Sequence, residues 1–108
     1  MKKKELLKEK LSKQLSRQMI KYENEGMSPK EEARFFQNLV NTGLAWRLQG
    51  SYGRRAMELI ESGVIMLGKK GHNDFYGNYV PSRYEVQQGT KGSSEYVKKM
   101  RKKLGEVM

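Results

Sequence analysis

Residues 35–63, FFQNLVNTGLAWRLQGSYGRRAMELIESG, decide the fold of this 108-residue chain. They hold its single Trp and two of its three Phe, and Gly residues divide them into three segments with helical periodicity. Gly commonly ends helices because it adopts a left-handed backbone without strain. The stretch therefore predicts short helices joined by tight turns, which form a trihelical unit over residues 28–63.

The clearest helix start lies just before this stretch, at residues 28–31. Ser28 can cap the helix, Pro29 suits the first helical position, and Glu31 completes a capping box. From this start we expect one helix to about residue 41, a shorter helical piece over residues 44–48 and a third helix over residues 51–63.

A basic amphipathic helix is expected at each end of the chain. The first spans residues 3–23 and has one apolar face, formed by Leu7, Leu11, Leu15, Met19 and Tyr22. The last starts after a cap at Ser93 or Ser94, and its apolar face is formed by Val97, Met100, Leu104 and Val107. Lys and Arg cover most of both helices, so each presents a positive surface.

Residues 64–92 differ in composition from the helical segments. The apolar run at residues 64–67 fits either a buried strand or an extended connection, and Gly77-Asn78 favours a hairpin turn between Tyr76 and Tyr79. Pro81 limits any strand here to a sheet edge. The expected fold is mainly α, with the trihelical unit flanked by the two basic helices and a Tyr/Gly-rich loop or short hairpin at about residues 64–90.

This pattern predicts a basic arm followed by one small domain. The arm comprises residues 1–25 and the domain residues 26–108. Within the domain we expect a trihelical core over residues 28–63, loops or short strands over residues 64–92 and the basic helix over residues 93–108.

The charge distribution narrows the class of partner. The net charge is +10, and residues 1–22 carry eight Lys or Arg against two Glu. Residues 23–63 carry five basic against six acidic residues, and residues 64–108 carry nine against four. Positive ends around a neutral middle are typical of contact with phosphate backbones, anionic lipid or an acidic protein face.

Several locations and chemistries are disfavoured by composition. There is no Cys, no apolar run long enough for a membrane span and no signal-peptide pattern, so we expect a cytoplasmic protein without a membrane partner. His72 and Asp74 could share a metal or pass a proton, but a turn explains Asp74 more simply. Gly68-Lys69-Lys70-Gly71 lacks the Walker spacing and remains at most a non-specific anion site. We expect no enzyme activity, no metal and no cofactor.

Residues 69–84 interleave aromatic and basic side chains, as single-stranded nucleic-acid binders do. The alternative is that these aromatics close a small core beneath a long loop. A helix-turn-helix is a further alternative, in which Tyr52, Arg54 and Arg55 would read bases. The candidate nucleic-acid contacts are Arg47, Arg54, Arg55, Lys69, Lys70, Tyr76, Tyr79, Arg83, Lys98, Lys99, Arg101, Lys102 and Lys103.

Residues 20–63, IKYENEGMSPKEEARFFQNLVNTGLAWRLQGSYGRRAMELIESG, resemble a family of short proteins from tailed-phage genomes. The shared pattern is FQxLVxTGLAWxLQGxYGR followed by LIxxG. Residues 74–100, DFYGNYVPSRYEVQQGTKGSSEYVKKM, resemble a second segment of small phage proteins, so the likeness covers roughly residues 20–100. Residues 24–27 depart from the family pattern. The resemblance implies a phage origin and assigns no catalytic or binding residue.

Three functions remain open at this stage. The first is a non-enzymatic phage-type accessory protein that binds DNA or RNA through its basic helices and Tyr-rich loop. The second is a protein that inhibits a host or defence nucleoprotein complex, in the manner of an anti-CRISPR, by binding a host or phage protein. The third is a self-associating structural protein, with a homodimer formed through the Leu7–Tyr22 helix face.

Overall fold

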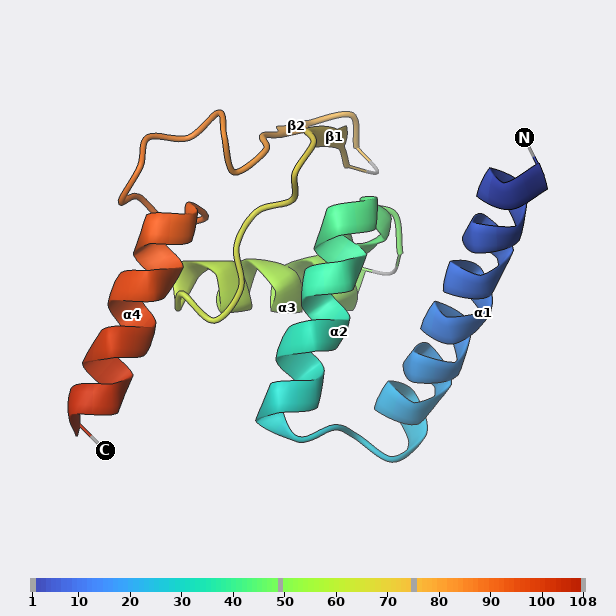
Figure 1. The fold of residues 1–108 in the computed structure, drawn as a ribbon, viewed down its shortest axis with the longest axis horizontal. Coiled ribbons are helices and arrows are strands. Elements are labelled where there is room, and N and C mark those ends of the chain that lie inside the picture. The colour runs from blue at the N-terminus through green and yellow to red at the C-terminus, as the bar shows by residue number, and fades with distance from the viewer. Residues whose placement is uncertain (1, 49, 75, 108) are drawn as a thin grey trace. The chain divides into compact units, whose positions relative to one another are not determined.

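The computed structural model describes residues 2–48, 50–74 and 76–107, with side chains for residues 13–48, 50–74 and 76–104. The side chains of Leu7, Leu11, Phe75 and Val107, expected on apolar faces or in the aromatic loop, lie outside this description. The elements in chain order (Figure 1) are α1 (Lys2–Asn24), α2 (Pro29–Thr42), the 3-10 helix η1 (Leu44–Trp46), α3 (Gly50–Glu61), β1 (His72–Asn73), β2 (Tyr79–Val80) and α4 (Ser94–Val107). The expected mainly α fold is confirmed.

The chain divides into two compact units, residues 1–35 and residues 36–108. The first contains α1 and the start of α2, and the second contains the rest of α2 and every later element. The expected division into an arm of residues 1–25 and a domain of residues 26–108 concerns independent folding and stays a prediction.

In the first unit, a tight turn connects α1 to α2. Gly26 has a φ of +79°, and its N–H donates to the Lys21 carbonyl, which ends α1. The Glu31 N–H then donates to Ser28 Oγ at 3.3 Å, and the Ser28 hydroxyl donates to Glu31 Oε1 at 3.2 Å. The predicted cap at Ser28 is therefore present. Lys21 Nζ also reaches Glu31 Oε2 at 2.6 Å and so links the two helices.

The described part of the α1 apolar face is largely covered. Leu15 is buried, and Met19 and Tyr22 are half-buried. The Tyr22 ring packs on Phe35 with a centroid separation of 5.4 Å. Since these side chains already lie against the chain, this part of the face has little apolar area left to offer a second copy.

The core of the second unit lies where α2, η1 and α3 meet. Phe36 from α2 and Tyr52 from α3 are both buried, and their ring centroids lie 6.1 Å apart. The buried apolar residues of this unit are Phe36, Leu39, Val40, Ala45, Trp46, Tyr52, Ala56, Leu59, Ile60, Ile65, Leu67 and Val97. The helical stripes predicted for residues 35–63 are therefore the faces that form this core.

Residues 64–67 form a connection that bends at residues 64 and 65, and they form no strand. The Gln37 side chain pairs with both backbone groups of Met66: Nε2 donates to the Met66 carbonyl at 3.0 Å, and the Met66 N–H donates to Oε1 at 2.9 Å. The Leu67 N–H donates to the Gly92 carbonyl. These bonds hold the connection against α2 and against the segment that leads into α4.

A short hairpin follows, as the Gly77-Asn78 pair predicts. β1 and β2 pair antiparallel, with His72 opposite Val80 and Asn73 opposite Tyr79. The Asp74 carboxylate accepts the N–H groups of Tyr76 and Asn78 at 2.9 and 2.8 Å. The turn role of Asp74 is confirmed, and its carboxylate is held by the hairpin backbone.

Within the described residues, α4 is attached through its first turns. Ser93 is the capping residue, since its Oγ accepts the Tyr96 N–H, and the Tyr96 hydroxyl donates to the Glu61 carbonyl at the end of α3. Val97 is fully buried, whereas Leu104 is 55% exposed. The predicted apolar face of α4 is therefore covered at Val97 and exposed at Leu104.

Candidate nucleic-acid interface

An open groove of about 790 Å³ lies in the second unit, between η1, α3 and the hairpin. Three elements that are separate in sequence supply its walls. Its principal side chains are Trp46 and Arg47 from η1 and its end, Arg54 and Met57 from α3, and Asp74 and Tyr76 from the hairpin turn. The fold thus brings together three of the predicted contact residues: Arg47, Arg54 and Tyr76.

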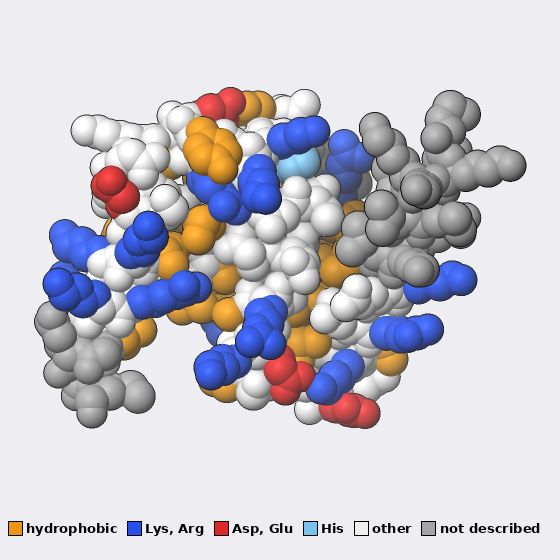
Figure 2. Space-filling model, in the orientation of Figure 1, with side chains coloured by type: hydrophobic (Ala, Val, Ile, Leu, Met, Phe, Trp, Pro, Cys, Tyr) orange, Lys and Arg blue, Asp and Glu red, His pale blue; other side chains and the backbone are white. Residues whose placement is uncertain are grey.

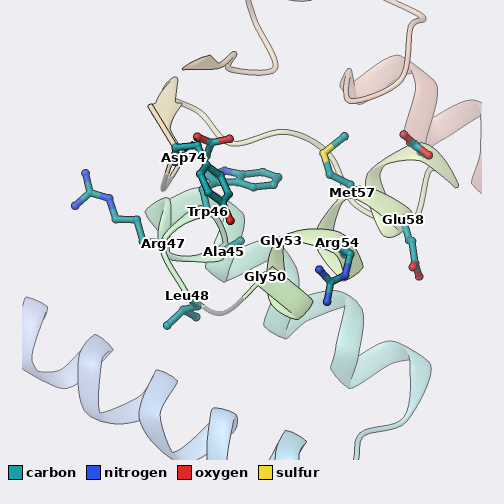
Figure 3. Close-up of a pocket in the computed structure, with 12 residues that line it drawn as sticks. Ala45, Trp46, Arg47, Leu48, Gly50, Gly53, Arg54, Met57, Glu58 and Asp74 are labelled. Carbon is teal, nitrogen blue, oxygen red and sulfur yellow. Dashed lines mark hydrogen bonds between the residues drawn. The ribbon is translucent and has the colours of Figure 1, made fainter. Parts of the chain in front are cut away.

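The groove has an apolar floor and an aromatic rim. Figure 3 shows Trp46 and Asp74 on one side, and Met57, Glu58 and Arg54 on the α3 side. Trp46 is 7% exposed and forms the floor, whereas Tyr76 is 85% exposed. Because Asp74 fixes the backbone N–H of Tyr76, this ring is carried by an ordered turn at the edge of the groove.

Two of the groove's cations are available to a ligand. Arg47 and Arg54 are exposed, and neither forms an ion pair within the described part of the chain. Arg47 extends away from the groove in Figure 3, while Arg54 lies over the first turn of α3. Arg55 differs, since its Nη1 pairs with Glu58 at 2.8 Å.

The predicted basic surface of α4 is present as a dense group of exposed side chains. Figure 2 shows Lys and Arg covering this helix on the face in view. The helix carries five Lys or Arg residues, and none of them forms an ion pair among the described residues. They are Lys98, Lys99, Arg101, Lys102 and Lys103.

Lys69 and Lys70 are exposed on the segment that leads into β1. The preceding Gly68 packs so closely on α2 that a Cβ there would lie 2.9 Å from the Val40 carbonyl oxygen. The two lysines are therefore presented from a backbone held against the core.

Tyr79 is hydrogen-bonded within the loop. Its hydroxyl donates to both Glu85 oxygens, at 2.6 and 2.8 Å, and the Ser82 N–H donates to Glu85 Oε2. The Tyr79 bond lowers the pKa of Glu85, with a further contribution from Ser82, and the same bond raises the pKa of Tyr79. Tyr79 is nevertheless 60% exposed.

Arg83 is bonded to the body of the second unit. Its Nε donates to the Leu67 carbonyl at 2.8 Å and its Nη2 to Asn41 Oδ1 at 3.1 Å. Both acceptors lie far from Arg83 in sequence, so the guanidinium ties the later loop to α2. A phosphate contact by Arg83 remains a prediction. It would have to use guanidinium N–H groups that do not take part in these two bonds.

The structure changes the interpretation of two aromatic residues, Tyr52 and Trp46. Tyr52 is only 4% exposed and packs in the core, so it cannot read bases as the helix-turn-helix alternative requires. Trp46, interpreted as structural, also lines the groove, together with Met57. One signal pointed there: Gly53 stands within the helix predicted over residues 51–63, where Gly is disfavoured unless space is needed.

His72 and Asp74 do not form a joint site. His72 Nε2 is buried and has no hydrogen-bond partner among the described residues, and the Asp74 carboxylate serves the hairpin turn. Within the same residues, no three His, Asp or Glu side chains gather closely enough to hold a metal ion. The His72 ring instead covers Gly43, where α2 ends.

The comparison with protein families gives one result. Residues 10–77 match the model of a domain of unknown function, DUF7417. The chain belongs to this family. No curated protein and no solved structure matches it. In the described parts of the chain, residues 2–48, 50–74 and 76–107, no helix has the length and apolar character that a membrane crossing needs.

The position of the DUF7417 match separates the two candidate surfaces. Every residue that lines the groove falls within residues 10–77, whereas α4 lies beyond them. The groove therefore lies within the residues that match DUF7417, and α4 lies outside them.

Proposed function

We propose that this protein is a small, non-enzymatic accessory protein of phage type that binds nucleic acid in the cytoplasm of the host cell. The observation that carries the proposal is the group of five exposed cations on α4, none of them paired with a described residue. Unpaired cations on one helix are available to neutralise consecutive phosphates, and this releases the counterions condensed on the nucleic acid.

The second unit supports the proposal beyond α4. Lys69 and Lys70 are exposed, Arg47 and Arg54 are free of ion pairs, and Tyr76 and Tyr79 present exposed rings. Residues 36–108 carry twelve Lys or Arg against six Asp or Glu. Cations beside exposed aromatics are the combination that holds a backbone and its bases together.

The test is equilibrium binding to labelled DNA and RNA of random sequence, measured by fluorescence anisotropy at low salt. The variant K98E/K99E reverses two α4 charges, and the matched control K30E/R34E reverses two exposed charges on α2. The net charge changes equally in both. We expect the α4 variant to lose on the order of tenfold in affinity and the control to lose much less.

Two results would overturn the proposal. One is the absence of binding to either nucleic acid at low salt. The other is an equal loss in the two variants, which would mean that only the net charge matters and that α4 makes no specific contact.

A protein partner is the second candidate, favoured by apolar side chains left exposed on the two basic helices. Leu104 on α4 is 55% exposed and Ile20 on α1 is 59% exposed, and a phosphate backbone uses neither. Affinity capture from infected cells with nuclease present separates the two functions. Recovery of one host protein under nuclease favours an inhibitor of a host or defence complex, whereas loss of all partners favours nucleic acid.

A further inference from the structure

α3 contains a glycine that the folded chain does not need. Gly53 lies inside the helix without a positive φ, and a Cβ placed on it would lie 3.5 Å from the Ala45 oxygen and 3.9 Å from Trp46 Cε3. These are ordinary contacts, so Ala would fit. Gly destabilises a helix interior relative to Ala. Gly at this position therefore has a stability cost that no contact with the described residues explains.

What Gly53 does provide is space in the groove. Gly50 and Gly53 both line it in the first turns of α3 (Figure 3), and a Cβ on Gly53 would lie 3.9 Å from Trp46. The groove volume of about 790 Å³ falls within the range of about 300–1,000 Å³ typical of small-ligand sites. The absence of two side chains keeps the groove open along its α3 wall.

The charges around the groove indicate what enters it. Three carboxylates line the groove. That of Asp74 accepts two backbone N–H groups and that of Glu58 pairs with Arg55, whereas that of Glu61, at the end of α3, is exposed. Arg54 has no such partner among the described residues, and its Nη1 lies 3.2 Å from where a Gly50 Cβ would be. The site thus combines an apolar floor, an exposed aromatic ring and a free guanidinium, which complement a flat ring that carries an anion.

We infer that this groove binds one unpaired base of a single-stranded nucleic acid, between the Tyr76 ring and the floor formed by Trp46 beside Gly53, with its phosphate at Arg54. This inference rests on the proposed function. It adds to that function the form of the nucleic acid, a single strand, and the position of one base. A base within a duplex keeps its faces stacked on its neighbours and cannot enter. The protein therefore prefers single strands.

The test compares a single-stranded oligonucleotide with the duplex of the same sequence and length. Trp46, the only Trp of the chain, serves as an intrinsic probe because it forms the floor of the groove. We expect the single strand to change the Trp46 emission and to bind more tightly than the duplex. Stacking of one base corresponds to roughly 5- to 150-fold in affinity.

Three variants assign the effect to the groove. Gly53→Ala narrows it, Tyr76→Ala removes its rim, and Tyr84→Ala removes an aromatic ring that is 68% exposed and outside the groove. We expect the first two to lower single-strand affinity at least about fivefold and to leave duplex affinity unchanged. Tyr84→Ala should change neither.

The outcomes separate this inference from the proposed function. If the wild type binds single strands but Gly53→Ala and Tyr76→Ala do so equally well, the groove inference is overturned and the proposed function stands. Equal affinity for duplex and single strand, with no change in Trp46 emission, would likewise overturn the groove inference and leave the proposed function standing. If the wild type binds neither form, both are overturned.

Discussion

Gly43 has to be glycine for two reasons, its backbone conformation and its contact with His72. Its φ of +83° belongs to the left-handed region, and a Cβ there would lie 2.6 Å from His72 Nδ1. The Gly43 N–H also donates to the Val40 carbonyl, which ends α2. The turn from α2 into η1 and the seat of the hairpin on the core therefore depend on the same missing side chain.

Gly43→Ala should destabilise the second unit by about 1–3 kcal/mol from backbone strain, with the contact on His72 adding to this. Gly77→Ala is the matched control, because it has the same φ of +83° but nothing within 4 Å of its Cβ position. Urea unfolding followed by circular dichroism measures both. Equal losses in the two variants would show that the His72 contact has no energetic weight.

Gly53→Ala should change stability in the opposite direction. Since its Cβ meets only ordinary contacts, the substitution should stabilise the protein by roughly 0.5–1 kcal/mol through helix propensity. The measurement is the urea midpoint of the variant against wild type. A lower midpoint would mean that Gly53 is needed for packing, and the reason for assigning it to a ligand would disappear.

Among the elements, the helices follow from local sequence and their connections do not. Ser28, Gly26 and Gly63 mark helix ends through caps and backbone conformation that involve only near neighbours, so the sequence predicts them. Gln37 bonds to Met66 and Arg83 to Asn41, and nothing in the local pattern selects partners so far apart in sequence. The groove forms between elements that such connections bring together. The sequence could therefore predict single residues that line it, but not that they meet.

Gln37→Leu tests how the connection at residues 64–67 is attached to α2. The substitution leaves both the N–H and the carbonyl of Met66 without their partner in a half-buried position. We expect a loss of about 1–3 kcal/mol in the free energy of unfolding. The control is Asn38→Leu on the adjacent exposed position. If both variants lose the same amount, the Met66 bonds do not contribute to stability.

The link between α1 and α2 should depend on pH. The hydrogen bond from Lys21, then that from Ser28, lowers the pKa of Glu31 from its usual 4.5. A lowered folded-state pKa stabilises the fold above the unfolded value, and this stabilisation is lost as the pH falls through the folded value. Glu31→Gln should therefore be less stable than wild type at neutral pH, and the two should converge in acid. A constant difference across this range, measured by thermal unfolding, would contradict the assignment.

The whole molecule is positive in both units, and this sets its expected behaviour. Residues 1–35 carry ten Lys or Arg against six Glu, and residues 36–108 carry twelve against six acidic residues. Under the proposed function, α4 supplies electrostatic attraction from outside the DUF7417 match, and the inferred groove site inside that match supplies recognition. The charge pattern was readable from the sequence, whereas the juxtaposition of Trp46 with Tyr76 required the folded chain.

The most direct measurement of the central claim is the affinity for a single-stranded oligonucleotide between about 50 and 200 mM salt. Each phosphate contact on a single strand adds about 0.7 to the slope of log affinity against log salt. If the five α4 cations each meet a phosphate, the affinity should fall roughly a hundredfold over this range. Affinity that is flat across the range, or undetectable at its low-salt end, would contradict nucleic-acid binding as the function of this protein.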